Sequence, residues 1–151
     1  MALKTPQEYL DSLRKLNLEV YLLGERVKDP VDNPIIRPSL NSVIMTYELA
    51  QDPKYADLMV VDSHMTGEKI NRFTHIHQST DDLVKKVKMQ RLLGQKTGSC
   101  FQRCVGMDAF NAVYSTTYET DQKYGTEYHA RFKKFLEYVQ KEDGAYSLQR
   151  E

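Results

Sequence analysis

The apolar residues of this chain recur at helical spacing, and this periodicity limits the fold more than any other feature. The clearest stripe lies near the C-terminus at i, i+4, i+7, i+8 and i+11: Tyr128, Phe132, Phe135, Leu136 and Val139. A second stripe comprises Leu40, Val43, Ile44 and Tyr47. Such spacing gathers the side chains on one helix face that can be buried. We therefore predict a mainly α fold.

Capping signals indicate where the helices begin and end. In TPQE, Thr5 can cap a helix, Pro6 suits its first position and Glu8 can bond back to the cap. In STDDL, Ser79 is followed by two acidic residues, which the helix dipole favours in a first turn. We predict five helices. The first spans about residues 6–16, the second begins after a cap at Ser39, and the third spans 79 to about 93. The fourth spans 109–124 and ends at Gly125, and the fifth contains the C-terminal stripe.

One or two short β-hairpins are expected before Ser79. Val20–Leu22 favours a strand, Gly24 suits a turn, and residues 26–28 can return. The segment around Gly67 has strand-like ends and predicts the second hairpin.

Length and charge narrow the class of protein. The chain has 151 residues, enough for one domain, with 21 basic and 21 acidic residues and hence no net charge. This balance gives no basic footprint for nucleic acid. We see no apolar run long enough for a membrane helix and no signal peptide, and the scarcity of cysteine suits a reducing cytoplasm.

The two cysteines, Cys100 and Cys104, are four residues apart in GSCFQRCVGMDAF. If this segment were helical, both thiols would share one face. Three interpretations stay open: a disulfide, half of a metal site, or two small apolar residues in a core.

Other polar residues offer weaker signals. His75 and His77 would share one face of a strand and could bind a metal, or they could serve as surface polar groups or in a capping network. The basic run Lys85–Arg91 could meet phosphates or form a solvated helix face. Arg103, between the cysteines, must either face solvent or meet an anionic or carbonyl group.

Long stretches, including EVYLLGERVKD, STDDL and CFQRC, carry a resemblance over about residues 5–143. The chain resembles the N-terminal domain of the flavin-dependent 4-hydroxyphenylacetate 3-hydroxylase family, and within it the branch of the 4-hydroxybutyryl-CoA dehydratases/vinylacetyl-CoA isomerases. The cysteine pair separates this branch from the hydroxylases. The implied fold is a helical N-terminal domain of the acyl-CoA dehydrogenase-like type.

The resemblance implies an enzyme, a lyase and isomerase of 4-hydroxybutyrate metabolism. It implies that Cys100 and Cys104 are two of four ligands to a [4Fe–4S] cluster, and that Arg103 binds substrate. The complete enzyme would also bind FAD and a CoA thioester, and would form a homo-oligomer, a tetramer in the family. The alternatives are a flavin-dependent aromatic hydroxylase-like domain and a non-enzymatic helical module that binds metal or a partner.

The sequence spans only part of such an enzyme. We expect residues 1–151 to form a single helical domain, without the family's middle β domain and C-terminal helical bundle. The chain alone would then hold half a cluster site, bind neither cofactor and be inactive, and its partners would be the remaining domains.

Overall fold

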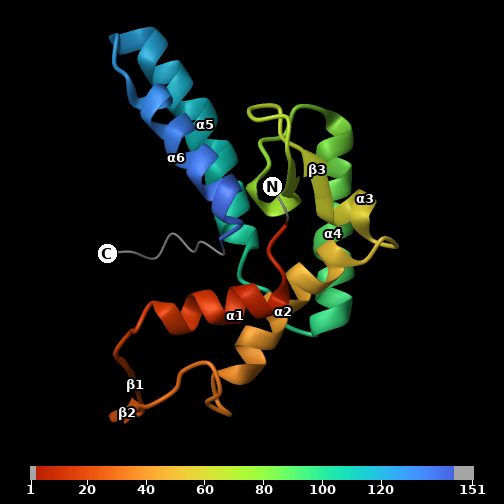
Figure 1. Cartoon of the computed structure of the whole chain (residues 1–151). Coiled ribbons are helices and arrows are strands. Elements are labelled where there is room, and N and C mark those ends of the chain that lie inside the picture. Colours follow the sequence, from red (N-terminus) through yellow and green to blue (C-terminus); the bar gives the residue numbers. More distant parts are fainter. Residues whose placement is uncertain (1–2, 145–151) are drawn as a thin grey trace.

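Six helices and two small antiparallel sheets make up residues 3–144, the part of the chain that the computed structural model describes (Figure 1). The helices are α1 (Pro6–Lys15), α2 (Arg37–Gln51), α3 (Ala56–Met59), α4 (Thr80–Thr97), α5 (Cys104–Tyr124) and α6 (Tyr128–Glu142). Strands β1 (Val20–Leu22) and β2 (Glu25–Val27) form one hairpin, and β3 (Val60–Asp62) and β4 (Lys69–Asn71) form the other. A single 3₁₀ turn, η1 (Arg72–Thr74), follows β4. The predicted mainly α fold with two short hairpins is confirmed.

Three helix boundaries follow from the capping residues. The Thr5 hydroxyl accepts from the Glu8 N–H at 3.2 Å, and the Glu8 carboxylate accepts from the Thr5 N–H at 2.7 Å, which completes a capping box. The Ser79 hydroxyl accepts from the Asp82 N–H at 3.2 Å and begins α4. Gly125 ends α5 in a left-handed conformation with φ 66°, which glycine adopts without steric penalty.

Three other boundaries differ from the prediction. Helix α2 begins at Arg37 instead of after Ser39, because the Asn33 side chain and carbonyl organise the turn that leads into it. Helix α4 continues past the expected end at Leu93 to Thr97, where Gly98 (φ 62°) stops it. Helix α5 begins at Cys104, five residues before the expected start.

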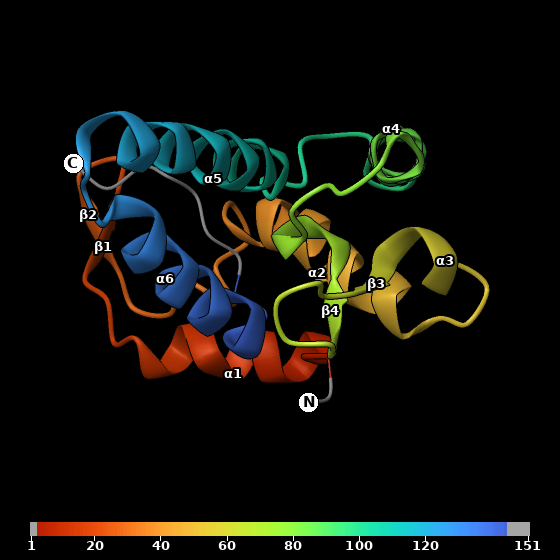
Figure 2. The ribbon, with the colours of Figure 1, turned by 90° about the horizontal axis from the view of Figure 1, so that it is seen from above.

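The helices are arranged around η1 and α2. Helices α5 and α6 form a long antiparallel pair on one side, and α4 lies on the other side (Figures 1 and 2). Helix α1 packs across α2 below them. The loop from α4 to α5 therefore connects the two sides of the molecule; it carries Cys100, and Cys104 follows as the first residue of α5.

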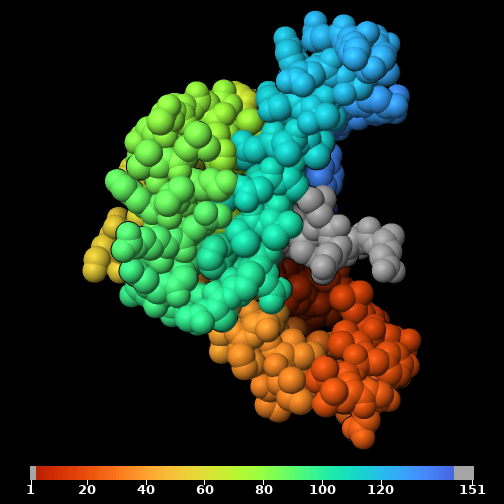
Figure 3. Space-filling model, turned by 180° about the vertical axis from the view of Figure 1, so that it is seen from behind, coloured from red at the N-terminus to blue at the C-terminus, as the bar shows by residue number. Residues whose placement is uncertain are grey.

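The interior consists of three apolar clusters. The largest lies under the α4–α5 loop and comprises Leu49, Ala50, Met59, Phe73, Met89, Leu93, Phe101 and Met107. The second joins α1 to α2 and comprises Tyr9, Leu10, Val31, Val43, Ile44 and Tyr47. The third joins α5 to α6 and comprises Ile76, Phe110, Leu136 and Val139. The α5–α6 tip and the β1–β2 hairpin project beyond these clusters at opposite ends (Figure 3).

Candidate functional site

The cysteines lie on a turn that opens a helix, so the expectation that they share one helical face is wrong. Cys100 precedes α5, and Cys104 is its first residue. Between them, Gln102 adopts a left-handed conformation with φ 60°, and the Arg103 N–H donates to the Phe101 carbonyl at 2.9 Å. A left-handed residue cannot continue an α-helix. The turn, and not a helix over residues 100–104, therefore brings the cysteines together.

Both cysteines are free, and their thiols are neighbours. Cys100 is exposed and Cys104 is half-buried against the largest apolar cluster. Burial raises the pKa of the Cys104 thiol, and the nearby Cys100 thiol raises it further through its charge and hydrogen bonding. The Cys100 sulfur also accepts from the Gln102 N–H at 3.4 Å. The pair offers two sulfur donors at the surface, one of them open to solvent.

Arg103 points into the molecule, away from solvent. Its side chain is 2% exposed and forms an ion pair with Asp143, Nη2 to Oδ1 at 3.0 Å. Nη1 donates to the Thr46 hydroxyl at 3.1 Å, and Nη2 also donates to the Gly144 carbonyl at 3.3 Å. The predicted need for an anionic or carbonyl partner is confirmed. The substrate-binding role of Arg103 stays a prediction.

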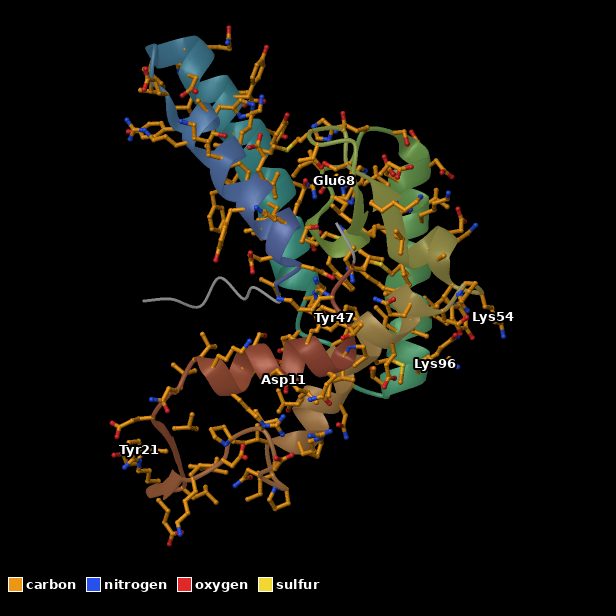
Figure 4. All side chains as sticks on the ribbon, in the orientation of Figure 1. Asp11, Tyr21, Tyr47, Lys54, Glu68 and Lys96 are labelled. Carbon is orange, nitrogen blue, oxygen red and sulfur yellow. The ribbon has the colours of Figure 1, made fainter. Side chains whose placement is uncertain are left out.

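The guanidinium is enclosed by aromatic rings as well. Its carbon lies 4.7 Å from the Tyr47 ring centroid and 4.9 Å from that of Phe73. Tyr47 lies near the centre of the molecule, where α1, α2 and the end of α6 meet (Figure 4). Its hydroxyl donates to the Asp143 carbonyl at 2.8 Å. Arg103 thus ties the cysteine loop to α2, η1 and the end of α6.

Sequence reasoning missed Asp143 and Thr46, the polar partners of Arg103. Asp143 follows α6 with φ 41°, a left-handed conformation that is unusual for a residue other than glycine. Its other carboxylate oxygen accepts from the Lys4 N–H at 3.2 Å. The Asp-Gly pair after the last helix was the available signal, because aspartate tolerates left-handed caps better than most residues. The Asp-Gly pair predicts a helix cap, but it does not predict a buried ion pair.

The histidines gather at a second place. The His64, His75 and His77 rings form a chain with centroids 6.4 Å and 6.2 Å apart. Burial lowers the pKa of each of these three histidines. His75 is buried and lies 3.3 Å from Asp82, on the first turn of α4. Over residues 3–144, no group of three or more histidine, cysteine or acidic side chains has the arrangement of a metal site.

Two lysines of the basic run on α4 form ion pairs. Lys85 contacts Asp57 at 2.7 Å and Asp81 at 3.4 Å, and Lys86 contacts Asp108 on α5. These lysines connect α4 to α3 and α5. This arrangement favours the solvated-face interpretation over a phosphate site. Within the described range, no helix is both long and apolar enough to cross a membrane.

Fold and sequence together define the class of protein. Residues 5–148 match the family model described as 4-hydroxyphenylacetate 3-hydroxylase N terminal, and the chain belongs to this family. It is 67% identical over 141 residues to the 4-hydroxybutyryl-CoA dehydratase/vinylacetyl-CoA-Delta-isomerase of Clostridium aminobutyricum. That match covers 93% of this chain and 29% of the relative, so the chain spans less than a third of the relative's length.

Solved structures agree with this assignment. An oxygen-tolerant archaeal 4-hydroxybutyryl-CoA dehydratase from N. maritimus superimposes with a TM-score of 0.90 at 53% identity, over 95% of this chain and 28% of that one. The oxygenase component of a 4-hydroxyphenylacetate 3-monooxygenase in complex with FAD gives a TM-score of 0.70 at 20% identity, over 94% of this chain and 29% of that one. The second likeness shows the shared fold alone.

Proposed function

We propose that this chain is the N-terminal, cysteine-bearing part of a flavin- and [4Fe–4S]-dependent enzyme. The complete enzyme would dehydrate 4-hydroxybutyryl-CoA to crotonyl-CoA and shift the double bond of vinylacetyl-CoA. The observation that carries the proposal is the pair of free, adjacent thiols at the surface, in a chain 67% identical to the clostridial dehydratase/isomerase. The chain by itself would be inactive.

The thiol pair fits the role of two cluster ligands. Iron–sulfur clusters are held by thiolates, and a [4Fe–4S] cluster takes four protein ligands. Cys100 and Cys104 supply two sulfur donors from one turn, and the remaining ligands would come from the rest of the complete enzyme. When bound, such a cluster with an exchangeable iron position supplies a Lewis acid for a substrate hydroxyl.

The residues of this chain would have a supporting part in the reaction. The exposed side of the α4–α5 loop presents the thiols, and its buried side fixes their position through Phe101 and Arg103. Flavin binding belongs in this proposal to the complete enzyme, since the FAD-bound hydroxylase component shares this fold. A CoA thioester, the other domains and further copies of the enzyme would be the partners, in a cytoplasmic tetramer.

A chimera tests the proposal. This chain would replace the matching 141 residues of the clostridial relative, and iron content and crotonyl-CoA formation would be measured. The unmodified chimera should contain the cluster and be active, whereas Cys100→Ala and Cys104→Ala should lose both properties. Gln95→Ala, at an exposed position on α4, serves as the control. A Cys104→Ala chimera with a normal cluster and normal turnover would show that the ligand assignment is wrong.

The same chimera distinguishes the proposed dehydratase from the aromatic hydroxylase alternative, because the two enzymes act on different substrates. An aromatic hydroxylase would need no cysteine pair, and its activity would survive both cysteine variants. The non-enzymatic alternative predicts a folded chimera with neither activity.

A further inference from the structure

The α4–α5 loop, residues 98–103, is fixed from below by two side chains. Phe101 is 7% exposed and packs on Phe73, with ring centroids 5.7 Å apart. Arg103, two residues later, enters the same interior and lies over Phe73 and Tyr47. The intervening Gln102 has the left-handed conformation that lets both neighbours point inward. The loop therefore has a buried side, which carries no cysteine, and an exposed side that begins with Cys100.

The deepest attachment is the ion pair between Arg103 and Asp143. The two side chains are only 2% and 6% exposed, so water does not screen their interaction as it would at the surface. Asp143 itself adopts the left-handed backbone conformation at the end of α6, and this conformation directs its carboxylate toward Arg103. A glycine would adopt the conformation without strain, whereas an aspartate does so at a cost. Its other oxygen is occupied by the Lys4 N–H. Backbone strain that persists in a native structure is held by the contacts around it.

We propose that the Arg103–Asp143 pair is a positioning device that sets the separation and direction of the two thiols, that of Cys100 on the α4–α5 loop and that of Cys104 at the start of α5. The inference rests on the proposed function, in which Cys100 and Cys104 are ligands. Arg103 is covalently adjacent to Cys104, so its anchored side chain fixes the residue that begins α5. A ligand pair on a loop binds a bridging atom well only when the surrounding contacts hold the sulfurs at the required distance.

The arginine acts through position and not through its charge. A positive charge turned toward Cys104 would favour the thiolate and lower the pKa of that thiol. Instead, the guanidinium is directed to Asp143, Thr46 and Gly144, and these groups occupy its donors. Asp143, forty residues away in sequence, thereby becomes a residue of the cysteine site without touching a cysteine.

Phenylarsine oxide tests the device in the 151-residue chain without a cluster. The reagent forms two As–S bonds with two nearby thiols, both thiol protons leave with its oxygen as water, and no oxidant is needed. Asp143→Asn keeps the shape of the cap and removes the charge, and Thr46→Val removes one acceptor of Arg103 while leaving the charges intact. Both variants should bind the reagent at least about tenfold more weakly, as for other supporting residues of metal sites.

A control variant and a monothiol reagent separate positioning from unfolding. Asp108→Asn removes an exposed carboxylate that pairs with Lys86 on α4, and it should bind phenylarsine oxide like the original chain. The rate of Cys100 alkylation by iodoacetamide and the helical circular dichroism should stay unchanged in Thr46→Val. If Asp143→Asn does not fold, Thr46→Val decides. Arsenical affinity unchanged in a folded variant of either kind overturns the inference.

The same variants distinguish a failure of this inference from a failure of the proposed function. In the clostridial chimera, Asp143→Asn should lower iron content while Asp108→Asn does not. If the Cys104→Ala chimera keeps the cluster, the assignment of Cys104 as a ligand is wrong. The phenylarsine oxide measurement then still decides whether Arg103 and Asp143 position the thiols.

Discussion

At the scale of single residues, the two thiols differ in access although they are four residues apart. Cys100 is exposed, whereas Cys104 is half-buried and burial raises its pKa. The thiolate is the reactive form, so a raised pKa lowers the reactive fraction at neutral pH. This difference gives each cysteine a separate, measurable behaviour.

We expect iodoacetamide to modify Cys100 before Cys104 at pH 7.5. The Cys104 rate should rise steeply as the pH increases toward 9.5, because its raised pKa moves its ionisation into that range. Peptide mass spectrometry after timed quenching measures both rates, and urea-unfolded protein, in which the two should react alike, is the control. Faster modification of Cys104 in the native chain would contradict the structure.

Arg103 and Asp143 make a different prediction, because a buried charge without its partner is strongly destabilising. Asp143→Ala should lower the free energy of unfolding by about 3–5 kcal/mol, the usual loss when one member of a buried pair is removed. The double variant Arg103→Met, Asp143→Asn should be much less affected, because no uncompensated charge remains. Urea titration followed by circular dichroism gives the values. Equal losses in the single and double variants would show that the cost lies in packing and not in the charge.

At the scale of elements, local signals succeeded where the side chain that sets a boundary lies beside that boundary. Thr5, Ser79 and Gly125 are of this kind, and each was readable from the sequence. The starts of α2 and α5 have no side-chain cap, so the capping pattern that located the other helices could not locate them. Likewise, the inward turn of Arg103 depends on Asp143, and nothing in the intervening sequence relates these positions. Candidate site residues such as the two cysteines and Arg103 could be predicted from the sequence, but the long-range contacts that hold them in place could not.

The first turn of α4 joins a cap to an ion-pair network through Asp82. Its carboxylate accepts from the Gln78 N–H at 2.9 Å and contacts Arg72 at 3.2 Å and His75 at 3.3 Å. Although burial alone would raise it, the bonds from Gln78, His75 and Ser79 lower the pKa of Asp82 to about 2. A carboxyl group whose folded pKa is depressed stabilises the fold above its unfolded pKa and loses that contribution as the pH falls.

Asp82→Asn should therefore destabilise the chain by about 2 kcal/mol at pH 7, as a shift from about 4 to about 2 implies. The difference from the original chain should shrink between about pH 4 and pH 2 and vanish below that range. Urea unfolding at several pH values measures it. Asp11→Asn, an exposed carboxyl on α1, is the matched control. A constant difference down to pH 2 would mean that the ionised carboxylate is not what stabilises α4.

At the scale of the whole molecule, apolar side chains are exposed on faces that the described part of the chain does not cover. Leu83, Val84 and Val87 are 48%, 43% and 61% exposed on α4, although their helical spacing resembles that of a core stripe. On the outlying β1–β2 hairpin, Tyr21 is 63% exposed (Figure 4). The chain spans 29% of the length of its clostridial relative, so we expect the rest of such an enzyme to cover the α4 face.

The isolated chain should consequently self-associate through α4, because exposed apolar patches favour burial against one another. The double variant Leu83→Glu, Val87→Lys should remain monomeric at higher concentration, and its i, i+4 ion pair should preserve the helix. Tyr124→Lys, which removes an exposed ring at the α5–α6 tip, is the control and should associate like the original chain. Sedimentation velocity over a hundredfold concentration range would measure these states. A stable monomer at the highest concentration would show that the α4 face needs no partner, and its covering by further domains would then lose its physical support.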